Sequence, residues 1–96
     1  MLLDKPIAKN DIITIKTGAG EELIARFFDE SQTELVVEKP ATIAQSPQGM
    51  GIIPWMMTTK AEKISLNKSN VVAFAITDQE IAKAYTEATT GIQIAT

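Results

Sequence analysis

Short runs of β-branched and other apolar residues, separated by turn-forming residues, make up most of the chain. Several of these runs alternate apolar and polar positions, which is the period of a β-strand. Glycine, proline, asparagine or acidic residues bound them and favour turns. Predicted strands therefore cover residues 12–17, 21–28, 34–39, 52–59, 63–66 and 71–76. The last run is apolar throughout, which predicts a buried strand.

Two prolines shape the expected course of the chain between the third and fourth of these strands. Pro40 is expected to stop the third strand, because proline has no amide hydrogen to donate to a sheet. The segment 40–51 lacks charge and is rich in turn formers, so much of it is expected to be an excursion, parts of which could continue the third strand. Pro54 restricts the strand at 52–59 to a sheet edge or a bulge.

A helical signal follows the strands, at residues 78–89. Thr77 and Glu80 have the spacing of a capping box, in which each side chain binds an amide group of the first turn. Gly91 is placed to end the helix in a left-handed conformation. The apolar positions that recur at helical spacing, and that predict the buried face, are Ile81, Ala84, Tyr85 and Ala88.

Length, charge and hydropathy indicate one domain in the cytoplasm. The chain has 96 residues, enough for a single core, and its net charge of −3 requires that any RNA site be local. No segment approaches the roughly 20 apolar residues that span a bilayer, and the start of the chain lacks the apolar core of a signal peptide, so no membrane partner is expected. The predicted parts are an N-terminal arm at 1–10, a barrel at 11–76, a helix at 78–89 and a tail at 90–96.

The chain contains neither histidine nor cysteine, so the common general bases and nucleophiles are missing. We therefore expect no enzymatic activity, no cofactor and no metal centre. The carboxylate pairs Glu21-Glu22 and Asp29-Glu30 could ligate Mg²⁺ or Ca²⁺, but they border predicted turns, where solvated charges are the simpler interpretation. The segment 18–20 is glycine-rich but lacks the lysine and following helix of a phosphate-binding loop, and we interpret it as a turn.

Two short motifs resemble those of the Sm and Sm-like proteins. The first family motif combines an alternating apolar strand, a Lys-x-Gly turn and a Phe-Asp pair, to which residues 13–18 and Phe28-Asp29 are similar in sequence and separation. Residues 35–37 then resemble the third strand. The second motif joins an apolar pair through a short turn to a strand that opens Asn-Val, and residues 64–71 are similar to it. The nearest comparison is with divergent Sm-like proteins of bacteriophage, which implies the cytoplasm of a bacterial or phage-infected cell.

The chain departs from the family pattern at three places. Asn67 and Lys68 stand where the family has arginine and glycine. The stretch Thr33-Glu34 before the third strand is one residue longer than usual and lacks the family's asparagine. Both places are base-contacting positions in the family. Leu23 replaces a glycine that eases the bend of the second strand, so bending here must use another device.

The resemblance implies a fold and an assembly. The implied fold is a small, strongly bent, five-stranded barrel of the Sm-like (SH3) type with a C-terminal α-helix. The implied assembly is a cyclic homo-oligomer of roughly five to seven subunits, in which the fourth strand of one subunit pairs with the fifth of the next and covers both exposed edges. The apolar run around Pro54 supports such a contact, although the same side chains could all pack inside one barrel. The expected interface residues are Ile52, Ile53, Trp55, Met57, Val71 and Val72.

The resemblance also implies RNA binding at turns near the pore of the ring, where lysine neutralises phosphate and asparagine reads base edges. The first functional hypothesis is a non-catalytic ring that binds single-stranded, U-rich or A-rich RNA. The second is a structural or adaptor ring of the phage type that has lost RNA binding, and the acidic charge favours it. Trp55, Phe27 and Phe28 could stack on bases or pack inside the protein. The expected RNA-binding residues are Gln32, Thr33, Asn67, Lys68 and Asn70.

Overall fold

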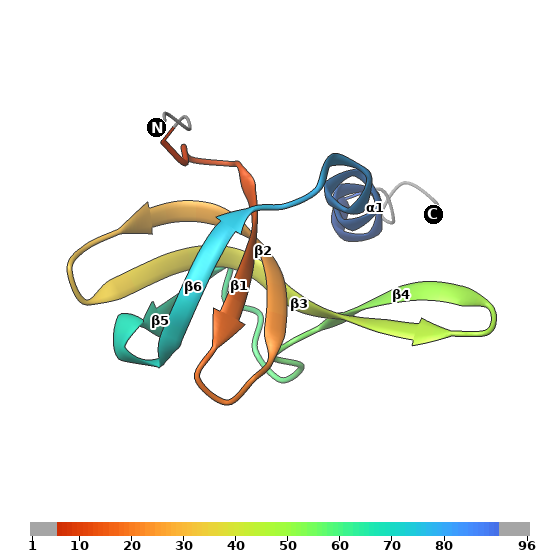
Figure 1. The fold of residues 1–96 in the computed structure, drawn as a ribbon, viewed down its shortest axis with the longest axis horizontal. Helices are drawn as coiled ribbons and strands as arrows, with labels where there is room; N and C mark the ends of the chain where they lie inside the picture. The colour runs from red at the N-terminus through yellow and green to blue at the C-terminus, as the bar shows by residue number, and fades with distance from the viewer. Residues whose placement is uncertain (1–5, 91–96) are drawn as a thin grey trace.

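The computed structural model describes residues 6–90, and these form six strands, one 3₁₀ turn and one C-terminal α-helix (Figure 1). The predicted mainly β class with a C-terminal helix is therefore confirmed. The elements are β1 Ile12–Thr17, β2 Glu22–Glu30, β3 Glu34–Ser46, β4 Gly49–Pro54, β5 Lys63–Asn67, η1 Lys68–Asn70, β6 Val71–Ile76 and α1 Gln79–Thr90. The first five residues of the predicted arm, and the predicted tail beyond Thr90, lie outside the described residues.

The strands of the described chain pair antiparallel in the order β4-β3-β2-β1-β6, and β5 also pairs with β3. The 13-residue β3 carries β5 along residues 34–38 and β4 along residues 41–46. Both lie on the edge of β3 opposite to β2. Ala41 has Ile24 of β2 on one side and Pro54 of β4 on the other, and Val37 pairs likewise with β2 and β5. β4 and β5 thus lie along the same edge of β3, so the six strands predicted from the sequence form five positions across the sheet, the number that the family resemblance implies.

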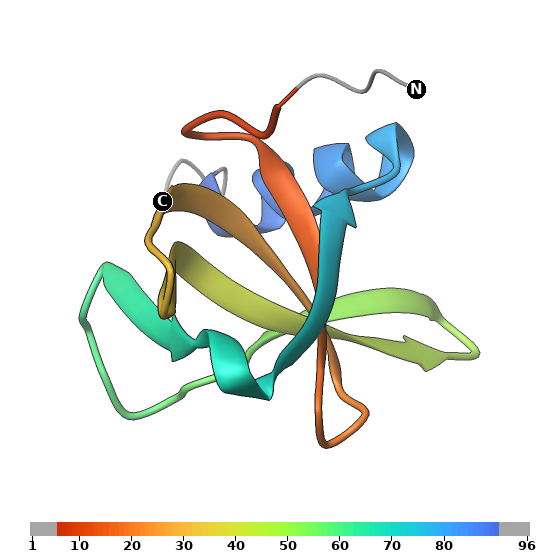
Figure 2. The same cartoon turned by 60° about the vertical axis from the view of Figure 1, so that its left-hand side comes forward.

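The sheet is not closed by hydrogen bonds within residues 6–90. η1 joins β5 to β6, but β5 pairs with β3 and β6 pairs with β1. β4 and β6 are consequently the two end strands of the main order. Figures 1 and 2 show the β3–β4 hairpin reaching out beyond the rest of the sheet. The strand pairing of residues 6–90 therefore does not confirm the closed barrel that the sequence resemblance implies.

Bulges bend the long strands where the family resemblance led us to expect a glycine. The register between β2 and β3 shifts between Ile24 and Arg26, and again between Phe27 and Asp29. An extra residue on one strand bends it and increases its twist. Leu23, at the position of the missing glycine, is buried in the core. The strand is therefore bent by irregular pairing, and position 23 is available for a core side chain.

Pro40 does not stop the third strand, contrary to the prediction. The register between β2 and β3 skips Lys39 and Pro40, so the missing amide of the proline costs no ladder hydrogen bond there. Lys39 adopts a positive φ of 50° at this kink. The Pro40 carbonyl accepts a hydrogen bond from the Trp55 amide at 2.9 Å. β3 continues to Ser46, and the expected excursion at 40–51 is mostly a regular hairpin.

The two end strands also differ from their predicted forms. Pro54 closes β4 at the edge of the sheet, as expected, but the strand predicted at 52–59 ends there, and residues 55–62 form the connection to β5. β6 was predicted to be buried. Instead Val72 is 69% exposed and Ile76 is 55% exposed, because β6 has a neighbouring strand on one side only.

The core consists of two apolar clusters. Successive residues of a strand point to opposite faces of a sheet, so Leu23 and Ile24 belong to different clusters. The larger cluster contains Ile13, Ile15, Leu23, Ala25, Phe27, Leu35, Val37 and Leu66. The smaller cluster contains Ile24, Ala41 and Tyr85. α1 therefore covers the second face of the sheet chiefly through Tyr85, with Ile81 packed against the same cluster.

The helix predicted at 78–89 is confirmed as α1, but its cap is not the predicted one. The Asp78 carboxylate accepts hydrogen bonds from the amides of Glu80 at 3.1 Å and Ile81 at 3.4 Å. Thr77 is buried, and its hydroxyl shares a 2.8 Å hydrogen bond with the hydroxyl of Thr14. Thr77 therefore ties the helix start to β1, and Asp78 satisfies the first-turn amides.

The predicted helix face is buried chiefly at its centre. Tyr85 is fully buried, Ile81 and Ala84 are half-buried, and Ala88 is exposed. The Tyr85 hydroxyl donates to the carbonyl of Lys39 at 2.6 Å, which anchors α1 at the kink of β3. Burial raises the pKa of Tyr85 from 10.0 to about 12, because the apolar surroundings disfavour the phenolate. Gly91, the predicted helix terminator, lies outside the described residues.

Candidate functional sites

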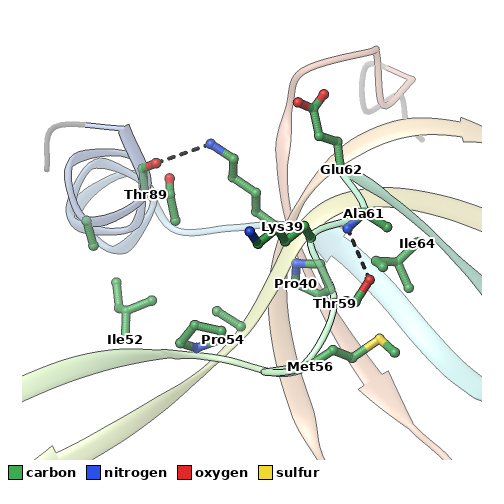
Figure 3. Close-up of a pocket in the computed structure, with 13 residues that line it drawn as sticks. Lys39, Pro40, Ile52, Pro54, Met56, Thr59, Ala61, Glu62, Ile64 and Thr89 are labelled. Atoms are coloured by element: carbon green, nitrogen blue, oxygen red, sulfur yellow. Dashed lines mark hydrogen bonds between the residues drawn. The ribbon is translucent and has the colours of Figure 1, made fainter. Parts of the chain in front are cut away.

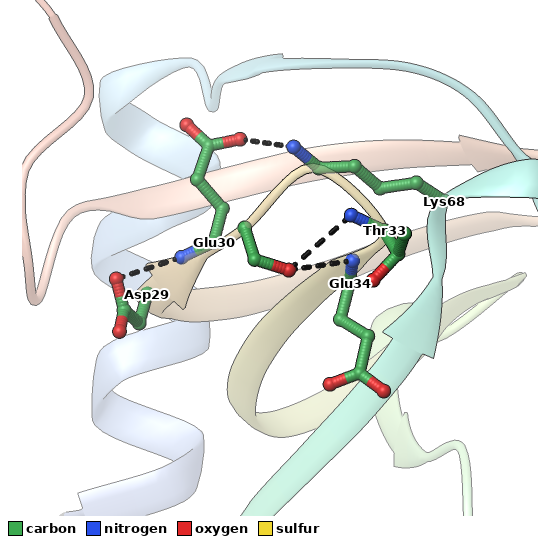
Figure 4. Close-up of polar contacts among 6 residues, drawn as sticks. Asp29, Glu30, Thr33, Glu34 and Lys68 are labelled. Atoms are coloured by element: carbon green, nitrogen blue, oxygen red, sulfur yellow. Dashed lines mark hydrogen bonds and ion pairs between the residues drawn. The ribbon is translucent and has the colours of Figure 1, made fainter.

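The turns that were expected to bind RNA lie next to each other (Figure 4). The Lys68 amide donates to the carbonyl of Thr33 at 2.8 Å, and Glu34 pairs with Asn67 across β3 and β5. Gln32 belongs to the same connection between β2 and β3 as Thr33. The expected RNA-binding residues Gln32 and Thr33 lie in the first of these turns, and Asn67 and Lys68 lie in the second. Asn70, the fifth expected residue, ends η1.

The polar groups of this turn cluster bind one another. The Lys68 ammonium forms an ion pair with the Glu30 carboxylate at 2.7 Å. The Asn67 side-chain oxygen accepts from the Ser69 amide at 3.0 Å and caps the 3₁₀ turn. The Asn70 carbonyl accepts from the Gly18 amide at 2.8 Å. These groups have structural partners inside the chain, so they need no ligand to be satisfied.

The charge of the turn cluster opposes nucleic acid. Lys68 faces a strand end and a turn that carry three exposed carboxylates, those of Asp29, Glu30 and Glu34. Its own charge is already paired with Glu30. An RNA phosphate would have to compete with the Glu30 carboxylate for Lys68, and the negative charges of Asp29 and Glu34 on the same strand ends add to its repulsion. The locations of Asp29 and Glu34 relative to Lys68 follow from chain pairing and could not be read from sequence spacing.

The aromatic residues that were considered for base stacking have protein partners instead. Phe27 is buried in the larger core cluster, and Trp55 is half-buried against the same cluster. The ring centroid of Phe28 lies 4.7 Å from the Lys9 ammonium and 4.6 Å from the Lys63 ammonium. Cation–π contacts of this kind stabilise the fold without a ligand. These contacts favour the packing interpretation for all three rings.

Three of the expected interface residues are exposed in the subunit, and the other three are half-buried. Ile53 is 41% exposed on β4, Val72 is 69% exposed on β6, and Met57 is 76% exposed in the connection to β5. Ile52, Trp55 and Val71 are half-buried and pack against the two core clusters. Large exposed apolar side chains outside these six residues are Met50, Met56 and Ile76, of which Met56 belongs to the apolar run around Pro54 that supported a subunit contact. Ile76 was not expected at the interface, because the apolar run that contains it also fits a strand buried inside the protein.

An apolar pocket of about 400 Å³ lies between the end of α1, the kink of β3 and the connection 55–62 (Figure 3). Its apolar lining includes Pro40, Ile52 and Ile64. Lys39 at its rim donates from its ammonium to the carbonyl of Thr89 at 3.2 Å. The sequence contained no signal for this pocket, because it forms from segments that are distant along the chain.

The carboxylate pairs considered as metal ligands do not converge within the part of the chain that the structure describes, where no group of three candidate ligands was found. Glu22 forms an ion pair with Lys16 at 3.3 Å, and Glu30 pairs with Lys68. One carboxylate of each pair is therefore already balanced by a lysine and needs no metal ion.

Comparison with models of known protein families finds no match, and comparison with curated proteins finds none either. Among residues 6–90, no helix is both long enough and apolar enough to cross a membrane. What the protein does must therefore be argued from its own surfaces.

Proposed function

We propose that the chain is a ring-forming, non-catalytic subunit of the Sm-like type, in which β4 of one copy pairs with β6 of the next. This assembly would place a neighbouring copy on each of the two end strands of the sheet. The observation that carries the proposal is the match between these strands. Each has six residues, neither contains a charged residue, and both expose large apolar side chains.

Uncharged edge strands are unusual on a protein that works alone. An edge strand presents a row of unpaired amide and carbonyl groups, and monomeric proteins commonly protect it with charged residues or an inward bulge. β4 and β6 have no charged residue, and within residues 6–90 no strand pairs with their outer edges. Because the two edges are different surfaces, their contact is head-to-tail, and such a contact closes into a ring when the rotation between copies permits.

The contacts of the turn cluster favour a structural or adaptor role for this ring over RNA binding. The Lys68 ammonium forms an ion pair with Glu30 at 2.7 Å, and the nearby strand ends also carry Asp29 and Glu34. The net charge of −3 adds long-range repulsion of RNA at low salt. We therefore place the scaffold role first.

Light scattering coupled to size-exclusion chromatography tests the ring. The expected mass is about five to seven times the 10.4 kDa of the chain. Dilution over a hundredfold range should leave that mass unchanged if the ring is closed, since no subunit then has a free edge. A species that elutes at 10.4 kDa at all concentrations would contradict the proposal.

RNA binding through the turn cluster is the second candidate, and the contact between its two turns supports it. The scaffold role predicts no shift of U-rich or A-rich single-stranded RNA in a fluorescence anisotropy titration at low salt. If RNA is bound at this cluster, Lys68→Ala should lower the affinity and reduce the salt dependence of binding by about 0.7 in log–log slope, the contribution of one phosphate contact.

Glu30→Gln is the matched variant for this titration, because it removes the competing carboxylate and leaves Lys68 in place. If the turn cluster binds RNA, Glu30→Gln should increase the affinity for RNA. If the ring is a scaffold, the Glu30→Gln variant should show no measurable RNA binding. RNA binding by the unmodified chain that Lys68→Ala weakens would therefore replace the scaffold role with the RNA-binding one.

A further inference from the structure

The outer edge of β4 offers two amide groups and lacks a third. The Trp55 amide donates to the Pro40 carbonyl of β3 at 2.9 Å, so the backbone at position 55 faces inward, toward β3. Along an antiparallel pair, this orientation alternates with its opposite from one residue to the next. Pro54 therefore faces outward, where its missing amide costs no hydrogen bond within the subunit, and so do Ile52 and Met50. The free edge thus has amides at Met50 and Ile52 and only a carbonyl at Pro54.

The outer edge of β6 follows in the same way from its pairing with β1. The Thr77 amide donates to the Ile12 carbonyl at 3.0 Å, so the backbone at position 77 faces inward, toward β1. Alternation along the regular part of the ladder then turns Ile76 and Phe74 outward. The ladder becomes irregular at Val72, which the pairing with β1 skips. The regular outward amides of this edge are therefore those of Phe74 and Ile76.

We propose that β4 of one copy pairs antiparallel with β6 of the next in one specific register, with Met50 opposite Ile76. Ile52 then lies opposite Phe74. The inference rests on the proposed ring and specifies the contact between its copies. Antiparallel strands bond two opposite residues through the amide and carbonyl of both. Two outward residues on one edge therefore match two on the other, and all four outward amides find a carbonyl.

Other registers use these edges less well. A shift of two residues in one direction places Phe74 opposite Pro54, which has no amide to donate to the Phe74 carbonyl. A shift of two residues in the other direction places Ile52 opposite Val72, where the β6 ladder is irregular. A shift of one residue places outward groups opposite inward ones. In the proposed register, Pro54 lies opposite Val72, so the position without an amide meets the irregular one.

The same register accounts for exposed apolar side chains on the two edges. Residues directly opposite each other lie on the same face of a sheet, with their side chains in contact. Met50 is 39% exposed and Ile76 is 55% exposed in the subunit, and the proposed contact places these two side chains together. Ile52 and Phe74, which are half-buried in the subunit, continue the same row. Met50 and Ile76 thereby become interface residues that the sequence did not indicate.

Disulfide crosslinking between copies tests the register, and the chain has no native cysteine to compete. The Cα atoms of a hydrogen-bonded antiparallel pair lie about 5.5 Å apart, a distance that suits a disulfide. After mild oxidation, Met50→Cys combined with Ile76→Cys should give a series of crosslinked multimers on a non-reducing gel. The matched controls report the two shifted registers and should give only monomer. They are Ile52→Cys with Ile76→Cys, and Ile52→Cys with Val72→Cys.

Light scattering before oxidation separates failure of the register from failure of the ring. A ring that crosslinks through either control pair, or through none of the three pairs, overturns the register and leaves the ring in place. An unmodified chain that is monomeric at all concentrations overturns both, because the register requires a second copy.

Amide hydrogen exchange of the unmodified chain gives a second readout that needs no change at the interface. Measured by NMR, the four outward amides should exchange at least about tenfold more slowly in the ring than in an unstructured peptide, because each has a carbonyl partner in the next copy. The Ala75 amide faces β1 within its own subunit, and its protection serves as the reference. Exchange at the unstructured rate by any of the four amides in the ring would contradict the register.

Discussion

Replacing Tyr85 by alanine is expected to lower the free energy of unfolding by about 3–5 kcal/mol, the usual cost of removing a buried aromatic side chain. Tyr85 is fully buried and is the centre of the smaller cluster, where it packs with Ile24 and Ala41. Its hydroxyl also donates to the Lys39 carbonyl at 2.6 Å. The loss would be a large part of the roughly 5–15 kcal/mol that stabilises a small domain. Urea unfolding followed by circular dichroism measures it.

Tyr85→Phe separates the ring from the hydroxyl. It should cost about 1–3 kcal/mol, because the carbonyl of Lys39 loses its partner while the ring stays buried. The pKa of Tyr85 rises from 10.0 to about 12 on folding, so the fold favours the neutral phenol. This difference in pKa stabilises the folded protein by about 3 kcal/mol. The stabilisation is complete below pH 10 and is lost as the pH rises toward 12.

The alkaline loss should be absent in Tyr85→Phe, which has no proton to lose at this position. Lys83→Ala, on the exposed side of α1, is the control for changes in helix content and should stay within about 0.5 kcal/mol of the unmodified chain. A Tyr85→Ala variant no less stable than Lys83→Ala would mean that α1 is not anchored through this side chain.

A lysine on either end strand is expected to dissociate the proposed ring into species of lower mass. Val72→Lys alters β6, and Ile53→Lys alters β4. Both side chains are exposed in the subunit, so the fold should tolerate the charge. In the assembly, the lysine would lie beside the apolar side chains of the neighbouring copy's strand, and charged edge residues are a common barrier to strand pairing. Ala19→Lys, in the turn between the interior strands β1 and β2, should leave the mass unchanged.

Mixing the two edge variants gives a sharper result, because each retains one intact edge. The β4 edge of Val72→Lys can still pair with the β6 edge of Ile53→Lys, but the resulting pair has a lysine at both outer edges. Light scattering should therefore show about twice the monomer mass for the mixture and monomer for each variant alone. Rings that persist in both variants would exclude the β4–β6 contact.

The local elements of this protein could be predicted from the sequence because their signals are local. The β-branched run that contains Ile13 and Ile15, bounded by turn residues, predicted β1, and the 3.6-residue spacing that includes Tyr85 predicted α1. The restriction of Pro54 to a sheet edge or a bulge also followed from the chain alone, because a missing amide excludes proline from an interior ladder, and the strand order then placed it at the edge.

The residues of the candidate RNA site could be named from the sequence, but their environment could not. Thr33 and Lys68 lie 35 positions apart in the chain, and the pairing of β3 with β5 brings them together. The same pairing brings Lys68 to Glu30, and this contact turns a candidate phosphate ligand into one half of an ion pair. Charge at a site depends on all its neighbours, and most of these come from distant segments.

The amino-acid sequence by itself determined the mainly β class, the position of the helix and the absence of histidine and cysteine chemistry, because these depend on composition and on short periods. Only the tertiary structure decided that β3 passes through Pro40, that Asp78 caps α1 and that β6 is an exposed edge. A bulge opposite β2 accommodates the proline, the Thr14 hydroxyl holds Thr77, and strand order decides which apolar run lies at an edge. Each of these outcomes depends on a partner distant along the chain, which no local pattern encodes.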